Sequence, residues 1–185
     1  SDSITISIDS SYTTDSDGVG VFFNFAGNVV IPTNTVITGN GKGYPGGSAS
    51  SHDGNGGGKG IGYVTGFGDQ GGGGGAHGGD GADSTKLGGI AYGTSIAPEK
   101  IGSGGGTGVG PMTHVCTGGA GASAFRLAAG GELTINGSIQ FDGSNPACHH
   151  GGGGAGGSIY LTSTSILGNG SISANGGSVD ESAPT

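Results

Sequence analysis

The stretch GGAGASAFRLAAGGELTINGSIQFDG, residues 118–143, is echoed by GGAGGSIYLTSTSILGNGSISANG, residues 153–176, with a gap of two residues. In both, a Gly-Ala-Gly start leads into a β-rich run, then into Asn-Gly-Ser-Ile, then into an Asx-Gly turn. Two pairs of turn residues are 33 residues apart: Asn136 with Asn169, and Asp142 with Asn175. A repeat of about 20–50 residues is typical of stacked or solenoid folds, whose single units cannot bury an apolar face alone.

A third, partial copy lies near the N-terminus. The pattern Ile-x-x-[Asp/Asn]-Gly recurs at residues 37–41, and Ile37 precedes Ile139 by 102 residues, close to three repeat periods. We therefore expect Ile37, Ile139 and Ile172 to stack in one interior column. Strand-like apolar residues complete the predicted core: Phe125, Leu127, Tyr160 and Leu161. No helical periodicity survives ten residues, so the prediction is an all-β, β-helix or β-solenoid-like stack with essentially no α-helix.

Glycine supplies 50 of the 185 residues, and it occurs in runs at 71–75, 104–106 and 151–154. Such a composition is typical of low-complexity chains, but we expect order, because close backbone approach is a reason to exclude every Cβ. Extended polyglycine-II-like chains have about three residues per turn and no internal hydrogen bonds, so each must bond to its neighbours. The runs therefore predict layers of bare backbone packed beside the β layer.

The net charge of the chain limits the classes of binding partner that can be expected. The net charge is −8, and the five basic residues form no cluster, which argues against nucleic acid and anionic membranes. No apolar run is long enough to span a bilayer. The chain begins SDSITISI without an initiator Met, and we expect a mature, secreted product whose signal segment has been removed.

Two cysteines, Cys116 and Cys148, lie in glycine-rich surroundings. A disulfide closing about thirty residues would stabilise the chain by roughly 3–4 kcal/mol on the loop-entropy model, which suits a secreted protein with a thin core. Two alternatives stay open. The thiols are unpaired, or they bind zinc together with a histidine: His114, His149 or His150.

Residues 1–27 fall outside the repeat and form a predicted N-terminal β segment, followed by a glycine-rich repeat domain over residues 28–185. Its strand-like runs, residues 3–7 and 19–25, either cap their own chain or pair with a neighbouring subunit. The second option gives a head-to-tail contact, which generates filaments. On that hypothesis, deletion of residues 1–27 leaves soluble monomers.

The order of motifs over residues 28–178 resembles the glycine-rich repeat segments of large secreted and cell-surface proteins. Such segments are expected to form parallel β-helices. The long glycine runs are also similar to the polyglycine-II bundles of certain phage tail-fibre adhesins and of a glycine-rich antifreeze protein. The resemblance implies an extracellular scaffold, filament or adhesive surface, and no common enzymatic activity. Residues 1–27 and the short length of this chain depart from the pattern.

Candidate chemistry is sparse. Asp80 and Asp83 lie near His77, as a glycan-cleaving enzyme would require, but loop carboxylates that only solvate the chain are the simpler interpretation. Adjacent histidines in an extended chain point apart, so His149 and His150 make a poor metal pair. We expect no catalytic residue, no metal site and no cofactor. Calcium remains a weaker option, through three carboxylates that do not match an EF-hand: Asp9, Asp15 and Asp17.

Two surface features remain. Asn136 and Asn169 each begin an Asn-Gly-Ser acceptor for N-glycosylation, although Asn-Gly is equally suited to making a turn. Hydroxyl side chains at 33–38 and 162–164 would order water or ice if they formed a flat ladder, and are otherwise ordinary exposed strand residues. We therefore predict a non-enzymatic structural protein that forms an extracellular filament or surface layer with copies of itself. An adhesin that binds surface glycans, or an ice-binding module, is the alternative.

Overall fold

The computed structural model describes residues 4–7, 20–63, 70–110 and 114–178. The prediction of an all-β protein is confirmed: the described residues form strands, turns and extended segments, and none of them is helical. The strands are β1 (Ile4–Ser7), β2 (Val21–Phe25), β3 (Val29–Ile31), β4 (Thr35–Thr38), β5 (Gly108–Val109), β6 (Val115–Cys116), β7 (Ala124–Ala129), β8 (Glu132–Ile135), β9 (Ser138–Gln140), β10 (Ser158–Thr162), β11 (Ser165–Leu167) and β12 (Ser171–Ser173).

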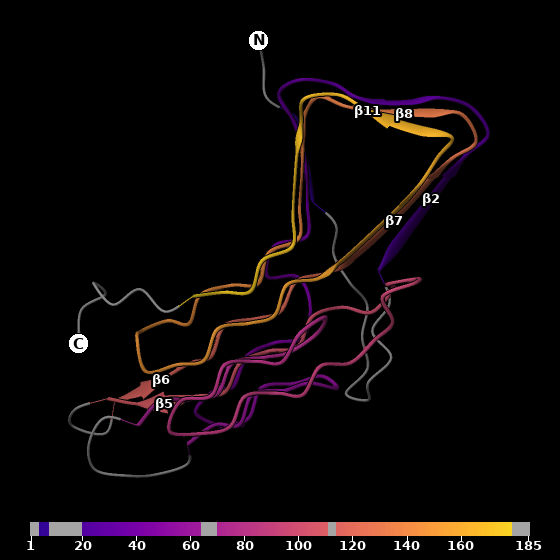
Figure 1. Ribbon diagram of the computed structural model, residues 1–185. Coiled ribbons are helices and arrows are strands. Elements are labelled where there is room, and N and C mark those ends of the chain that lie inside the picture. Colours follow the sequence, from indigo (N-terminus) through magenta and orange to yellow (C-terminus); the bar gives the residue numbers. More distant parts are fainter. Residues whose placement is uncertain (1–3, 8–19, 64–69, 111–113, 179–185) are drawn as a thin grey trace.

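Three parallel sheets are built from three separate stretches of chain, and the N-terminal strand β1 adds a fourth strand to one of them. The spatial orders are β10-β7-β2, β11-β8-β3 and β1-β4-β9-β12. Residues 21–38, 124–140 and 158–173 thus each contribute one strand to every sheet, in the same sequence order. In Figure 1 the sheets form the sides of a triangle, and one corner is open, because the chain there continues into long glycine-rich segments. The sheets therefore do not close into a solenoid.

The apolar core lies inside the triangle. Alternation of buried and half-buried residues along β7, β8 and β9 places one face of each strand inward, as period-two side chains require. Phe125 and Phe141 stack inside with ring centroids 5.5 Å apart. The remaining buried members of this core cluster are Ile31, Ile37, Ala122, Leu127, Ala129, Leu133, Ile135 and Ile139. The core is thin, and most residues of the chain lie outside the strands that form it.

The residues expected in one column have distinct places. Ile139 is the register partner of both Ile37 and Ile172, so the three isoleucines follow one another across the sheet. Ile37 and Ile139 are buried, whereas Ile172 on the outer strand is half exposed. Leu161 is the register partner of buried Leu127 and packs against the core.

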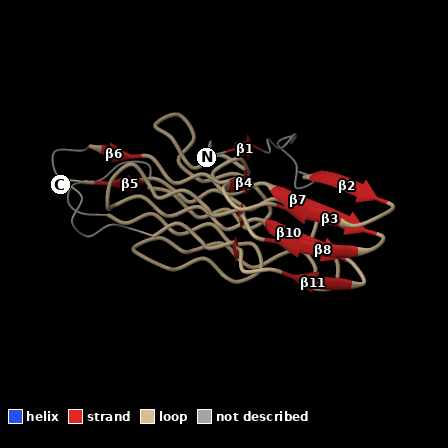
Figure 2. Cartoon of the chain, turned by 90° about the horizontal axis from the view of Figure 1, so that it is seen from above, coloured by secondary structure: helices blue, strands red, loops and turns tan. Residues whose placement is uncertain are grey.

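Extended glycine-rich segments form the rest of the molecule and run side by side away from the triangle (Figure 2). They bond to one another through the backbone: Gly102 N donates to Ala122 O at 2.8 Å, and Gly119 N donates to Gly152 O at 2.8 Å. A Cβ added at Gly105 would overlap the carbonyl oxygen of Gly152. Glycine is therefore required here by the closeness of neighbouring backbones.

A disulfide joins Cys116 on β6 to Cys148, with their Cα atoms 5.5 Å apart. This confirms the predicted pairing and removes the thiol and zinc alternatives for these residues. β6 pairs antiparallel with β5 at the end of the glycine-rich segments remote from the triangle (Figure 1). The bond thus fastens a two-stranded sheet that lies outside the apolar core cluster.

The N-terminal strands pair within their own chain. β1 pairs with β4, and β2 pairs with β7, both in parallel. The expected boundary at residue 27 falls between β2 and β3, which belong to two different sheets. The division into segments 1–27 and 28–185 stays a prediction.

Candidate assembly edges and buried polar cluster

Among the described residues, the three sheets have open edges at both ends of the stack. β2 and β3 are outermost at one end, where β1 extends the third sheet by one more strand, and β10, β11 and β12 are outermost at the other. An edge strand presents unpaired N–H and C=O groups that can pair with another chain. These edges carry exposed apolar side chains: Phe22, Phe23, Phe25 and Val30 at the first end, and Ile166, Leu167 and Ile172 at the second.

Asx side chains connect successive strands at the corners of the triangle. Asn40 Oδ1 accepts a hydrogen bond from Asp142 N at 2.7 Å, and Asp142 Oδ1 accepts one from Asn175 N at 2.6 Å. Asn136 Oδ1 in turn lies 3.4 Å from the donor Asn169 N. Each acceptor belongs to one stretch of chain and each donor to the next stretch in the stack. This ladder, which we call the Asx ladder, therefore has a direction and ends at Asn169 and Asn175.

The two candidate glycosylation residues occupy equivalent corners. Asn136 and Asn169 are both exposed, and both lie just before a strand of the same sheet, β9 or β12. The side-chain oxygen of Asn136 takes part in the Asx ladder, as a turn residue would. Glycosylation at either residue stays a prediction.

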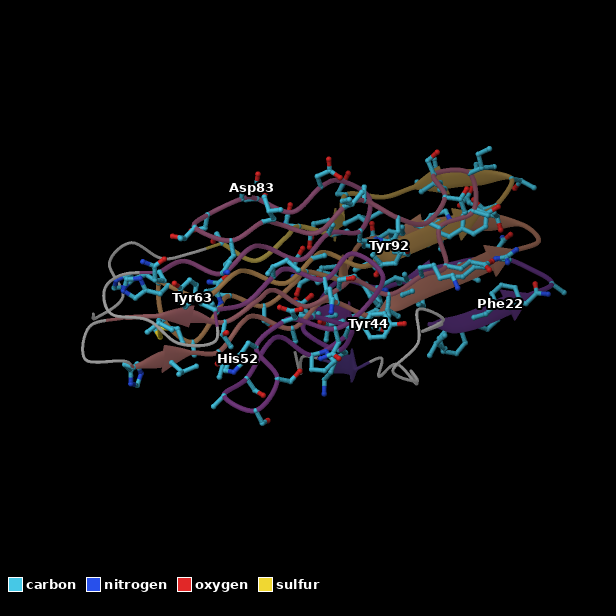
Figure 3. The ribbon with its side chains drawn as sticks, turned by 90° about the horizontal axis from the view of Figure 1, so that it is seen from below. Phe22, Tyr44, His52, Tyr63, Asp83 and Tyr92 are labelled. Atoms are coloured by element: carbon cyan, nitrogen blue, oxygen red, sulfur yellow. A yellow bond between two sulfur atoms is a disulfide. The ribbon has the colours of Figure 1, made fainter. Side chains whose placement is uncertain are left out.

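A cation lies between two aromatic rings on the outward face of one sheet. Arg126 is the register partner of Phe22 and of Tyr160, and its guanidinium lies 4.5 Å and 4.8 Å from their ring centroids. Glu99 Oε1 accepts a hydrogen bond from the same guanidinium at 2.5 Å. Tyr160 thus packs against Arg126 in this outward row, and Figure 3 shows Phe22 on β2 at the strand end of the molecule.

A buried polar cluster joins the glycine-rich segments to β10. Ser158 Oγ donates to the carbonyl of Lys100 at 2.7 Å and lies 3.4 Å from His77 Nε2. The rings of His77 and Tyr92 meet edge to face at 5.1 Å. Because the hydroxyl hydrogen of Ser158 is taken by a carbonyl, the arrangement holds segments together and does not present an activated nucleophile.

Burial shifts the pKa values of this cluster. Desolvation lowers the pKa of His77, although a hydrogen bond with the backbone of Gly157 opposes the shift. Desolvation also raises the pKa of Tyr92 to about 12, against the effect of the Ser103 hydroxyl. Tyr92 Oη donates to the carbonyl of Ile101 and accepts from Ser103 Oγ at 3.0 Å. Both side chains are therefore neutral at physiological pH.

The loop carboxylates bind backbone amides. Asp80 Oδ1 accepts from Ala91 N at 2.7 Å, and Asp83 Oδ1 accepts from Gly88 N at 2.8 Å. Each side chain therefore holds a turn of its own loop. Within the described ranges, no three His, Cys, Asp or Glu side chains gather closely enough to hold a metal ion. The calcium candidates Asp9, Asp15 and Asp17 lie outside the described residues.

The hydroxyl residues considered for ice binding differ in how far they are exposed to solvent. Thr35 is buried, Thr33 is exposed, and Thr38 Oγ1 accepts a hydrogen bond from Asn40 N at 3.3 Å. In the second group, Ser163 Oγ donates to Ser165 O at 2.9 Å. Ice binding stays a prediction that these residues do not strengthen.

Comparisons with known proteins found no relative of this chain. No protein-family model, no curated protein sequence and no solved structure matches this chain. Over the residues that the structure describes, no helix is present that could traverse a lipid bilayer. The interpretation of function therefore rests on this chain's own geometry.

Sequence reasoning missed the Asx ladder and the buried polar cluster. The ladder could have been found, because its residues recur at the repeat spacing of 33 that the two clear copies show. The cluster had no such signal. Tyr92, Ser103 and Ser158 come from three segments whose contact depends on how glycine backbones pack.

Proposed function

We propose that this chain is a secreted, non-enzymatic structural protein, a subunit of an extracellular filament or surface layer that assembles head to tail through β-strand contacts. In finer detail, we propose that its strands form a β-solenoid-like stack, with polyglycine-II-like layers at its side. One observation carries the proposal. Within the residues that the structure describes, the same sheets end in unpaired strands at both ends of the stack, and both ends expose apolar side chains.

The chemistry of the two ends supports joining. At one end, β12 presents an unpaired edge together with half-exposed Ile172. At the other, β1 is the outermost strand of the same sheet, and it already pairs in parallel with β4. A second copy whose β1 pairs with β12 would continue this sheet in the same direction. The contact is heterologous and does not close on itself, so it yields a filament.

Export is part of the proposal. The disulfide fits an oxidising compartment, and the acidic composition gives no basic surface for nucleic acid or anionic lipid. Two acceptor asparagines at exposed corners suit a secreted protein that carries glycans.

A single charge on the open edge tests assembly. We expect the purified chain to form filaments visible by negative-stain electron microscopy and to sediment as polymers. Ile172→Lys places a charge on the edge strand β12, and a lysine on an edge strand opposes pairing with another chain. This variant should remain monomeric. Ile96→Lys is the matched control, because Ile96 is 85% exposed on a loop outside the strands, and it should form filaments like the parent chain.

If the parent chain stays monomeric at all concentrations, the filament proposal is overturned. The second candidate, an adhesive or ice-binding module, is favoured by the exposed apolar side chains on the glycine-rich loop: Leu87, Ile90 and Ile96. Binding to a glycan array or inhibition of ice recrystallisation by a monomer would identify that function, and neither activity is expected of the filament subunit.

A further inference from the structure

A continuous groove runs along the surface of the glycine-rich segments. It consists of two hollows of about 400 Å³ and 300 Å³ that share Gly75, Asp80 and Gly176 in their linings. Four stretches of chain line it: residues 72–75, 77–84, 149–157 and 174–178. Most of these residues are glycine, so the groove, which we call the glycine groove, presents backbone rather than side chains. Asp83 on its rim is labelled in Figure 3.

The stretch 151–157 points its N–H groups in three directions, and it donates hydrogen bonds in two of them. An extended glycine chain has about three residues per turn, so residues three apart point their N–H groups the same way. One pair of amides, three apart, donates toward segment 103–106, and another donates toward segment 141–144. These bonds are Gly152 N to Gly106 O at 2.9 Å, Ala155 N to Ser103 O at 2.8 Å, Gly154 N to Ser144 O at 3.0 Å and Gly157 N to Phe141 O at 2.9 Å.

The third direction has no acceptor. Gly153 and Gly156 are also three residues apart, and their amides have no hydrogen-bond partner among the described residues. Both residues are partly exposed, whereas Gly152, Gly154 and Ala155 between and beside them are buried. Gly153 lines one hollow of the glycine groove and Gly156 lines the other. A row of unpaired donors therefore borders the groove.

A row of unpaired acceptors lies in the same groove. In the stretch 71–76 every amide is bonded, in the same three-residue rhythm, and the amides of Gly72 and Gly75 donate to His150 O at 2.8 Å and Gly153 O at 2.9 Å. The carbonyls of Gly72 and Gly75 accept no hydrogen bond from any described residue. Both residues line the groove. The groove thus offers donors and acceptors that each repeat at about 9 Å, three residues of extended glycine chain.

We propose that the glycine groove binds an extended, glycine-rich polypeptide segment of another chain. Such a segment carries one N–H and one C=O per residue and matches both unpaired rows. The segments already in the bundle show why glycine is selected, since added Cβ atoms would overlap neighbouring carbonyls, as at Gly153 with Gly177 O. Asp80 and Asp83 at the rim favour cationic residues beside the glycine run. The proposal does not depend on filament formation.

The probe is a hexaglycine peptide with one lysine at each end, titrated into the ¹⁵N-labelled monomeric variant Ile172→Lys. We expect saturable binding, with the amide resonances of Gly153 and Gly156 moving downfield and their hydrogen exchange slowing by about tenfold or more as the amides gain acceptors. A hexa-alanine peptide with the same lysines is the control for charge and length, and it should not bind.

Two matched glycine variants locate the site. An added side chain at Gly176 has open space, with only Gly154 O within 4 Å at 3.7 Å, and Gly176 lines both hollows. Gly176→Leu should therefore keep the fold while weakening peptide binding by about tenfold or more. Gly27 is equally unobstructed but lies on the turn between β2 and β3, away from the groove. Gly27→Leu should bind like the parent chain.

Equal binding of the glycine and alanine peptides, equal binding by Gly176→Leu, or no response at about 1 mM peptide would overturn the proposal. These outcomes are independent of assembly. Filaments without peptide binding would overturn the proposed role of the groove and leave the filament proposal standing. Peptide binding by a chain that never assembles would overturn the filament proposal and support the role of the groove. If Ile172→Lys is not folded, the same titration is carried out on dilute parent chain.

Discussion

His77 shows how one buried residue links pH to stability. It is only 8% exposed, and burial lowers its pKa below the ordinary value. In the unfolded chain the imidazole takes up a proton near pH 6.5, whereas the folded protein resists protonation. The unfolded state therefore binds more protons as the pH falls, and stability decreases below about pH 6.5.

This pH dependence is a prediction for denaturant titration. The free energy of unfolding of the parent chain should fall as the pH is lowered from 7.5 to 5. The reason is that the imidazole of His77 binds a proton more readily in the unfolded chain than in its buried place in the folded protein. His77→Gln should lose part of that pH dependence, since glutamine does not titrate. An identical slope in the two proteins would mean that other groups govern acid stability.

Glycine positions differ sharply in what they tolerate. Gly105→Ala should destabilise the fold by about 1–3 kcal/mol or more, because its Cβ would overlap the backbone of Gly152 in a fully buried segment. At Gly78 a Cβ meets nothing within 4 Å. Gly78→Ala should be neutral or stabilise by up to about 1 kcal/mol through the unfolded chain. Thermal melts of the two variants, compared at one pH, measure the difference.

At the scale of the elements, the Asx ladder fixes the corners where strands follow one another. Asp142 accepts hydrogen bonds from Asn175 N and from Ser173 Oγ, the latter at 2.8 Å. Asp142→Ala should reduce the free energy of unfolding by about 1–3 kcal/mol, because it leaves the two donors without this acceptor. Asp142→Asn keeps an oxygen for the Asn175 amide and should cost less. Chemical denaturation of the three proteins decides the order, and equal losses would contradict the assigned role.

The disulfide acts on β6, which contributes no residue to the apolar core cluster. Cys116→Ser combined with Cys148→Ser should lower the free energy of unfolding by roughly 3–4 kcal/mol, the loop-entropy value for its separation of 32 residues. Reduction of the parent protein should give a similar loss in the same denaturation experiment. A variant as stable as the oxidised chain would show that the unfolded state is not constrained in this way.

The elements also show how far a sequence can predict such a fold. Alternating apolar residues and a repeated Asn-Gly-Ser-Ile indicated strands, and the cysteine pair indicated a disulfide, because side chains carry those signals. The partners of glycine segments could not be predicted. Gly102 bonds to Ala122, and Gly105 to Gly119, yet no side-chain pattern in the sequence distinguishes these neighbours from others. For the same reason the glycine groove and the cluster around Tyr92 were not foreseen.

Over the whole molecule, two kinds of packing stabilise two different parts of the fold. The triangle of sheets buries a thin apolar core, centred on residues such as Phe125 and Leu133. The glycine-rich segments instead gain their order from backbone hydrogen bonds between stretches far apart in sequence. Stability in such a chain is distributed over many close approaches, so we expect it to respond to single Cβ additions more than to loss of a surface charge.

The hydrogen bonds that residues 151–157 donate toward two neighbouring segments have a mechanical consequence. A pleated sheet resists tension along its bonded plane and slides readily across it, since its neighbours lie on two sides only. The extended segment 151–157, bonded toward segments 103–106 and 141–144, is held in more than one plane. A force applied from one side is passed to several neighbouring segments at once, so the proposed filament would resist deformation across its section as well as along its length.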